Sequence, residues 1–89
     1  MPKVTKIKPL VKFGNRVREL REQRDWSQED LAEVSQLHRN YIGGIERAER
    51  NPSTLNLLYL ARAFKLPVGS LFDDYTDYDF ARLPTRHRD

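Results

Sequence analysis

The chain of 89 residues contains no cysteine, and this absence excludes several kinds of chemistry. Without cysteine there is no disulfide, no thiolate nucleophile and no cysteine-ligated zinc site. The two histidines, His38 and His87, are far apart in the sequence and do not form a metal site by themselves. We therefore expect no metal and no cofactor, and the lack of cysteine favours a reducing cytoplasm.

Long apolar runs and the signatures of catalysis are also missing. Mean hydropathy is −0.77, and no segment approaches the roughly 18 apolar residues of a membrane-spanning helix. The first residues, MPKVTKIK, are basic but lack the apolar stretch of a signal peptide. No nucleophile and base pair, phosphate-binding glycine loop or metal-ligand spacing is present. We therefore expect neither a membrane protein nor an enzyme.

The distribution of charge divides the chain into three parts. Residues 1–12 carry four lysines, Lys6 among them, and no acidic residue, which predicts a basic arm. Residues 13–72 hold nine Lys/Arg, eight Asp/Glu and nearly all periodic apolar positions, which predicts one folded domain. Residues 73–89 begin acidic, end basic and show no periodicity. They are expected to form a tail that is either disordered or docked, on a partner or in a dimer.

Apolar spacing in the central part predicts an all-α fold, a compact bundle of about five short helices. Phe13, Val17 and Leu20 form one stripe on a helix of about residues 10–24. Ser27 followed by Asp30 has the pattern of a capping box, which starts a second helix close by.

Three more helical segments follow in the sequence. A third short helix precedes the turn 51–53, and the most hydrophobic helix, LNLLYLARAF, comes after that turn. Pro67 opens a last short segment, whose Leu71 and Phe72 are expected to close the core.

The second and third helices are joined by a turn of about four residues, which is typical of a helix-turn-helix. The run 13–72, with VRELREQRDWSQEDLAEVSQLHRNYIGGIERAERNPSTLNLLYLARAF within it, resembles the lambda-repressor-like (Cro/XRE) helix-turn-helix family. Its segment LHRNYIGGIERAERNP is most similar to the small controller proteins of restriction-modification systems. The resemblance implies a sequence-specific regulator of transcription that binds double-stranded DNA as a homodimer, on a pseudo-palindromic operator.

Matched residue by residue, the resemblance also implies roles at the third helix. The expected base-reading residues are Arg39, Asn40 and Tyr41, whose chemistry suits guanine, adenine and the thymine methyl group respectively. The expected contacts to DNA phosphates are Gln28, His38, Arg50, Asn51, Arg21 and Lys6, with His38 also the N-cap of the helix. An ion pair between Arg21 and Glu46 is expected to tie the first helix to the third.

Five positions leave questions that the sequence does not settle. For Tyr41, packing on a neighbouring helix and contact with DNA carry equal weight. Gly43 and Gly44 each cost about 1 kcal/mol relative to alanine inside a helix, so their expected benefit is a close approach to DNA or to the second helix. Ala48 stands where many family members have a left-handed glycine, so that turn is expected to be strained or differently shaped. Pro67 replaces the usual Ser-type cap of the last helix, so fewer backbone amides are expected to be satisfied there, and the resemblance leaves the dimer geometry open.

The dimer surface and the tail leave two hypotheses open. The candidate dimer contacts are Leu55, Tyr59, Leu71 and the aromatic residues of the tail, Tyr75, Tyr78 and Phe80. The alternative is a protein-interaction module, an antitoxin or coactivator-like subunit whose acidic and aromatic tail, DDYTDYDF, wraps a protein partner.

Overall fold

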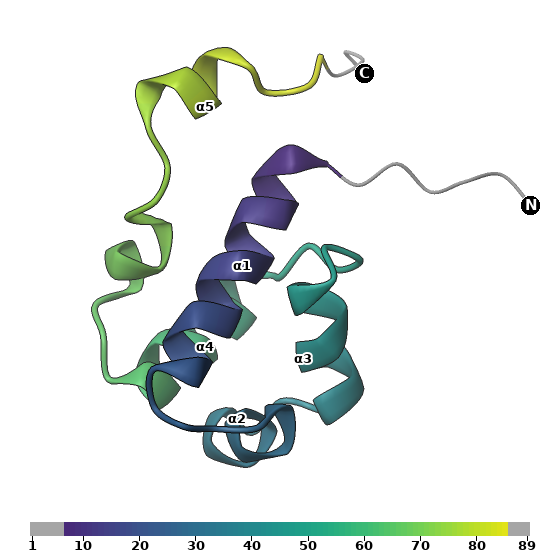
Figure 1. Ribbon diagram of the computed structural model, residues 1–89, viewed down its shortest axis with the longest axis vertical. Helices are drawn as coiled ribbons and strands as arrows, with labels where there is room; N and C mark the ends of the chain where they lie inside the picture. Colours follow the sequence, from purple (N-terminus) through teal and green to yellow (C-terminus); the bar gives the residue numbers. More distant parts are fainter. Residues whose placement is uncertain (1–6, 86–89) are drawn as a thin grey trace, which may run out of the picture.

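The computed structural model describes residues 7–85, so Lys6 lies outside the described residues. Within this range the chain is all-helical and contains no strand, which confirms the predicted fold class. The elements in chain order are α1 (Lys8–Glu22), α2 (Gln28–Ser35), α3 (Arg39–Glu46), α4 (Thr54–Phe64), the 3-10 helix η1 (Val68–Phe72) and α5 (Asp77–Ala81) (Figure 1). None of these helices is both long enough and apolar enough to cross a membrane.

Helix α1 begins and ends two residues earlier than its apolar stripe predicts. Pro9 lies in its first turn, where a helix has no acceptor for the missing N–H. The predicted boundary after residue 12 therefore falls inside α1. The helix stops at Glu22, and the chain turns toward α2 through Asp25, which has a left-handed φ of 55°.

The capping box at the start of α2 is confirmed in full. The Asp30 backbone N–H donates to the Ser27 hydroxyl at 3.0 Å, and the Ser27 N–H donates to the Asp30 carboxylate at 2.8 Å. Helix α2 ends at Ser35, followed by Gln36 with a left-handed φ of 66°. The turn to α3 is thus residues 36–38, one residue shorter than expected.

The hydrophobic core lies between α1, α2, α3 and α4, with η1 closing one side. Each large buried side chain contributes about 1.5–3 kcal/mol to folding. Trp26 and Ala32 are half-buried and pack against it. Leu71 has no exposed surface and lies in the core, which confirms its predicted place there; its predicted place in the dimer surface is therefore wrong. The largest core side chains are Phe13, Val17, Leu20, Leu31, Ile42, Ile45, Leu60, Phe64 and Leu71.

A glycine sets the approach of α1 to α3. A Cβ atom on Gly14 would lie 2.5 Å from the carbonyl oxygen of Ile45 and 2.8 Å from that of Glu46. Both neighbours are backbone atoms, which cannot rotate away as a flexible side chain does. The two helices therefore touch backbone to backbone at the point where α3 ends.

The two turns that depart from the family pattern also have unusual caps. Ala48 adopts a left-handed φ of 62°, a conformation that costs a residue with a Cβ atom roughly 1–2 kcal/mol. Its methyl group is buried, which offsets part of this cost. Pro67 caps η1 without any side-chain hydrogen bond, as expected from the loss of a Ser-type cap.

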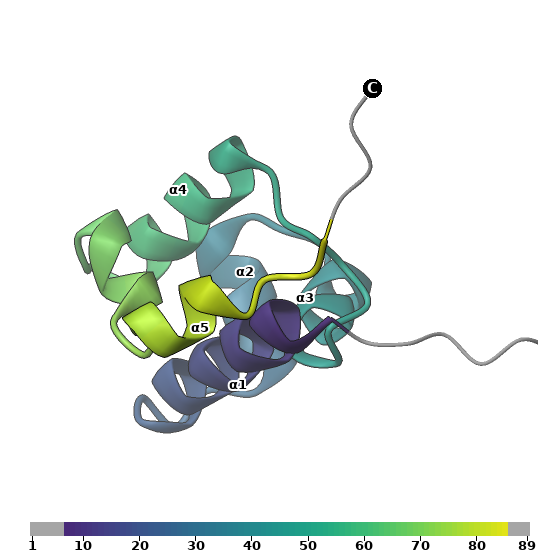
Figure 2. The ribbon, with the colours of Figure 1, turned by 90° about the horizontal axis from the view of Figure 1, so that it is seen from above.

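The tail folds back over the start of α1, and Figure 2 shows α5 crossing that helix. The Tyr75 hydroxyl donates to the carbonyl oxygen of Pro9, and Lys12 Nζ lies 2.9 Å from Asp79 Oδ2. The Phe72 ring lies between Phe13 and Tyr75, with centroid distances of 5.7 Å and 6.0 Å. Residues 73–85 thus pack on α1 of the same chain, and whether the tail also docks on a partner or in a dimer stays a prediction.

Candidate nucleic-acid interface

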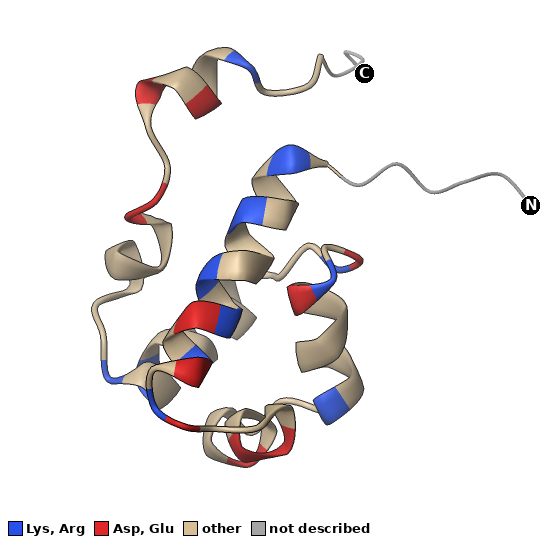
Figure 3. Ribbon diagram, in the orientation of Figure 1, with Lys and Arg blue, Asp and Glu red and all other residues tan. Residues whose placement is uncertain are grey.

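The start of α3 is held by a side-chain cap. His38 Nδ1 accepts the backbone N–H of Asn40 at 3.0 Å, which makes His38 the N-cap. Because Nδ1 is the acceptor, the neutral ring carries its hydrogen on Nε2, which remains available as a donor on an exposed residue. Figure 3 shows the basic start and the acidic end of α3, with uncharged residues between them.

Two of the expected base-reading residues, Arg39 and Asn40, are exposed on the first turn of α3. Arg39 Nε lies 2.8 Å from Glu29 Oε1, so the arginine is tied to the first turn of α2. The hydrogen bond from Arg39 and its positive charge lower the pKa of Glu29. Sequence reasoning missed Glu29, because a spacing of ten residues across a turn follows no helical period.

The third expected base-reading residue, Tyr41, is half-buried and packs on the core. Its hydroxyl accepts a hydrogen bond from the side-chain amide of Asn56 in α4 at 3.0 Å. The structure therefore favours the packing role for Tyr41. Asn56 gave no signal in the sequence, since an amide in the first turn of an amphipathic helix is ordinarily a surface residue.

A buried carboxylate, Glu46, joins α1, α2 and α3. Its side chain has no exposed surface, and it accepts from Arg21 Nε at 2.7 Å and Arg21 Nη2 at 2.9 Å. Gln28 donates to it at 3.1 Å and Arg18 at 3.3 Å. Burial alone raises the pKa of Glu46, but the hydrogen bonds from Arg21, Gln28 and Arg18 outweigh it, so the pKa lies below its ordinary value. We call Arg18, Arg21, Gln28 and Glu46 the Glu46 node.

The Glu46 node changes what is expected of two predicted phosphate contacts. Arg21 also donates to the carbonyl oxygen of Trp26 at 2.8 Å, and its side chain is only 13% exposed. Arg21 thus forms the predicted ion pair with Glu46, and its contact with a phosphate stays a prediction. The side-chain amide of Gln28 is turned inward, which leaves its backbone N–H at the start of α2 as the donor for a phosphate. Arg18, which sequence reasoning missed, has a side chain that is 45% exposed, and its hydrogen bond to Glu46 uses Nε.

The glycine pair of α3 makes room for neighbouring side chains. A Cβ atom on Gly43 would lie 2.8 Å from Arg47 Nη1 and 3.4 Å from Gln28 Oε1, and one on Gly44 would lie 2.7 Å from Arg50 Cγ. The close approach thus brings α2 and the loop after α3 against the helix. Arg50 and Asn51 are both exposed in that loop, at the opposite end of α3 from Arg39.

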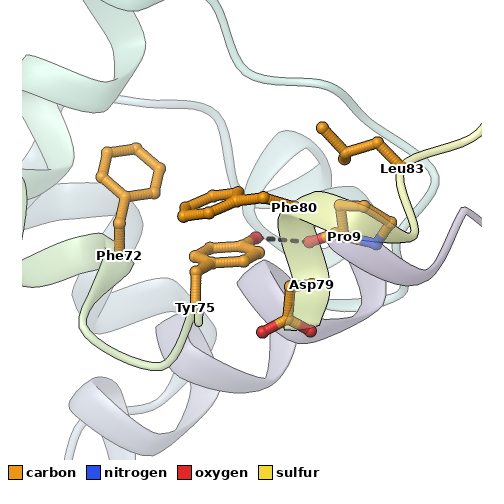
Figure 4. A pocket seen from close by; sticks show the side chains of 6 residues that line it. All are labelled: Pro9, Phe72, Tyr75, Asp79, Phe80 and Leu83. Carbon is orange, nitrogen blue, oxygen red and sulfur yellow. Dashed lines mark hydrogen bonds between the residues drawn. The ribbon is translucent and has the colours of Figure 1, made fainter. Parts of the chain in front are cut away.

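A second candidate site is an apolar hollow of about 310 Å³ between the tail and the start of α1. In Figure 4 the ring of Phe80 lies over that of Tyr75, whose hydroxyl points to Pro9. Phe80 and Leu83 are 59% and 55% exposed at its rim. Its lining is apolar apart from Asp79, which is engaged by Lys12.

Comparisons with known proteins show which proteins share this sequence and this arrangement of helices. The helix-turn-helix family matches residues 17–71. The control protein C.SmaI of Serratia marcescens is 49% identical over 59 residues, which are 66% of this chain and 70% of that protein. The crystal structure of the restriction-modification controller protein C.AhdI from Aeromonas hydrophila superposes with a TM-score of 0.71 at 51% identity, over 73% of this chain and 98% of that one.

A DNA complex is among the similar structures. C.Esp1396I bound to a 19 base pair DNA duplex has a TM-score of 0.66 and 33% identity, over 72% of this chain and 85% of that one. The region matched by the family, residues 17–71, includes the capped start of α3 and the Glu46 node. The chain belongs to the helix-turn-helix family of DNA-binding regulators, and its relatives include restriction-modification controller proteins.

Proposed function

We propose that the protein regulates transcription by binding double-stranded DNA at a specific operator, as a restriction-modification controller protein. The observation that carries the proposal is the first turn of α3, where Arg39 and Asn40 are exposed on a helix capped by His38. Identity of about one half to C.SmaI and C.AhdI supports it. The protein has no catalytic step and no cofactor in this role, and it acts in the cytoplasm, where bacterial DNA lies.

Base recognition in this proposal depends on Arg39 and Asn40. An arginine donates two hydrogen bonds to guanine O6 and N7, and an asparagine pairs with adenine N6 and N7 in the same groove. Each such pair contributes roughly 1–3 kcal/mol of discrimination. Tyr41 contributes the exposed part of its ring, while its hydroxyl stays on Asn56.

Contacts to the DNA backbone come from groups around these base-reading residues. The donors are the backbone N–H of Gln28, the Nε2–H of His38, the side chains of Arg18, Arg50 and Asn51, and Lys6 in the arm. Phosphate contacts hold the protein in register and carry no sequence information. Arg18 belongs to this set because the Glu46 node, with two arginines and one carboxylate, retains one positive charge.

The active species in this proposal is a homodimer. A single α3 offers too few base contacts for operator-grade affinity, whereas two copies on a two-fold axis lie about 34 Å apart, one turn of duplex. Leu55 and Leu58 on α4 and Val68 on η1 are exposed by 58%, 49% and 38%. Together with Tyr59 they form an apolar surface suited to a second copy.

Selection of bound duplexes from a random DNA pool tests the proposal. The recovered sequence is expected to be a pseudo-palindrome with half-sites about ten base pairs apart. Log affinity is expected to fall against log salt with a slope of roughly −7 if about eight phosphates are neutralised. Recovery of no preferred sequence would refute specific binding, and a monomer that binds one half-site as tightly as the whole duplex would refute the dimer.

Two substitutions separate base contacts from phosphate contacts. Arg39→Ala is expected to lower affinity for the selected duplex far more than for a scrambled one. Lys6→Ala is expected to weaken both duplexes alike, because it removes only a phosphate contact. Equal losses on both duplexes for Arg39→Ala would contradict its role in base recognition.

The exposed apolar rim of the tail favours a second candidate function, a protein-interaction module. Tyr78, Phe80 and Leu83 are all more than half exposed, beside the hollow described above. A stoichiometric partner that protects residues 73–85 from protease would support this role. It is compatible with DNA binding, because the tail lies against α1 and not against the start of α3.

A further inference from the structure

We propose that Glu29 is a positioning residue for base recognition: it orients the guanidinium of Arg39 so that one defined edge faces the DNA. The inference rests on the proposed function, in which Arg39 binds a guanine. It adds Glu29 to that contact. Glu29 does not touch the base, but it sets how well Arg39 discriminates between bases.

The geometry connects two helix starts. Glu29 is the second residue of α2 and Arg39 the first residue of α3, and Nε and Oε1 are 2.8 Å apart. Both side chains remain on the surface, 65% and 55% exposed. The pair therefore bridges the turn 36–38 at the place where the helix-turn-helix meets its target.

The contact uses one edge of the guanidinium and leaves another available. Arginine binds guanine with two N–H groups at once, and Nε is one of the donors in its side-on mode. Glu29 occupies Nε, so the end formed by Nη1 and Nη2 remains for the base. Within residues 7–85, no other hydrogen bond or ion pair engages the Arg39 guanidinium. A long side chain held in one orientation loses less conformational freedom on binding, which favours the matched base.

The carboxylate of Glu29 also affects general DNA affinity, in the direction opposite to its effect on discrimination. A negative charge beside the DNA repels phosphates and weakens binding to every duplex alike. Glu29 is therefore expected to lower general affinity while it raises discrimination. A residue with a purely structural role moves both affinities in the same direction, so the opposed effects are diagnostic.

Glu33 supplies a matched control on the same helix. It is a glutamate of α2, it is exposed, and it makes no ion pair or side-chain hydrogen bond in the described part of the chain. Glu33→Ala removes the same charge by the same change of residue as Glu29→Ala, and any difference in helix stability that comes from the first-turn position of Glu29 is measured by thermal unfolding. Only Glu29→Ala removes a partner of Arg39.

The experiment measures affinity for the duplex recovered by selection and for its scrambled version. Both alanine variants are expected to bind the scrambled duplex about twofold more tightly, because each removes one repelling charge. Glu29→Ala alone is expected to lower the ratio of the two affinities by roughly two- to fivefold, the range of an exposed ion pair. The loss of discrimination should occur at the same base pair of the duplex at which Arg39→Ala loses discrimination. Glu29→Gln, which keeps an acceptor without the charge, should lie between.

The outcomes separate this inference from the proposed function. If wild-type protein does not distinguish the two duplexes, the proposed function fails and the inference fails with it. If wild-type protein discriminates and Glu29→Ala leaves the ratio unchanged, or lowers it no more than Glu33→Ala does, the inference alone is overturned. It is also overturned if Glu29→Ala still lowers the ratio in an Arg39→Ala background. Thermal unfolding of each variant verifies that the fold is retained.

Discussion

Replacing Glu46 with glutamine tests whether the Glu46 node holds the three helices of the interface together. The substitution keeps the size of the side chain but removes its charge and turns one acceptor into an NH2 donor. That donor faces the N–H groups of Arg21 or Gln28, which already point at the carboxylate. Arg21 is then left nearly buried with an uncompensated charge.

The expected cost is large for a domain of this size. Removing one partner of a buried ion pair costs about 3–5 kcal/mol, against a total stability of about 5–15 kcal/mol. At roughly 4–8 °C per kcal/mol for such a domain, even the lower figure shifts Tm by roughly 12–24 °C. Thermal and urea unfolding followed by circular dichroism measure the change. Glu33→Gln, an exposed neutralisation on α2, is the control and should stay within about 0.5 kcal/mol.

The pH dependence of the same variant gives an independent measure. The pKa of Glu46 is lowered in the folded protein, so its stabilisation is fully present above the pKa of an unfolded glutamate, about 4.3. That stabilisation is lost as the pH falls through the lower, folded-state pKa. The difference in unfolding free energy between wild type and Glu46→Gln should therefore be constant near neutral pH and should become smaller below about pH 4. If Glu46→Gln lowers the free energy of unfolding by less than about 1 kcal/mol at neutral pH, the reasoning is refuted, because an ion pair exposed to solvent contributes that little.

Three further substitutions test contacts around the interface. Gly14→Ala is expected to destabilise by about 1–3 kcal/mol, because its Cβ would meet the backbone of α3; a neutral effect in urea unfolding would contradict the close approach. Tyr75→Phe should cost about 0.5–1.5 kcal/mol and speed proteolysis of the tail; unchanged cleavage would mean that the bond to Pro9 does not hold the tail. Asn56→Ala should lower discrimination between selected and scrambled duplexes by releasing Tyr41, and equal losses on both duplexes would contradict a role in orienting α3.

Local signals in the sequence were sufficient for the helices and their caps. The capping box depends only on Ser27 and Asp30, and the apolar stripe of α1 depends on residues three and four apart. The ends of α1 were displaced by two residues, because Pro9 extends the helix upstream and Asp25 turns the chain early. Neither effect changes the apolar period on which the prediction was based.

Contacts between helices were predicted less well. The pairing of Arg21 with Glu46 followed from family resemblance, and the structure adds Arg18 and Gln28 to it. The pairs Glu29 with Arg39 and Asn56 with Tyr41 depend on how two turns set the angles between helices. One left-handed residue, Gln36, fixes the first of these turns. The spacing of apolar residues in the sequence gives no information on the angle between two helices.

The tail is a second part of the structure that the sequence alone did not determine. Its residues have no helical or strand period, so the sequence left disorder and docking equally open. The choice is made by a few tertiary contacts, chiefly the hydroxyl of Tyr75 on Pro9 and the carboxylate of Asp79 on Lys12. Lys12 was assigned to the basic arm, yet the acidic tail already engages its charge. Among the described residues of that segment, Lys8 is the lysine that makes no ion pair.

Helix α3 is too short to orient itself. It has eight residues, two of them glycines, and an isolated helix shorter than about 12 residues is marginal in water. Its direction is set at both ends: Tyr41 is tied to α4 through Asn56, and Glu46 is tied to α1 through Arg21. Between those ends the glycines let α2 and the following loop approach closely. The contacts that orient α3 as a whole are thus buried or half-buried, and in the proposed function a substitution there is expected to alter recognition without touching DNA.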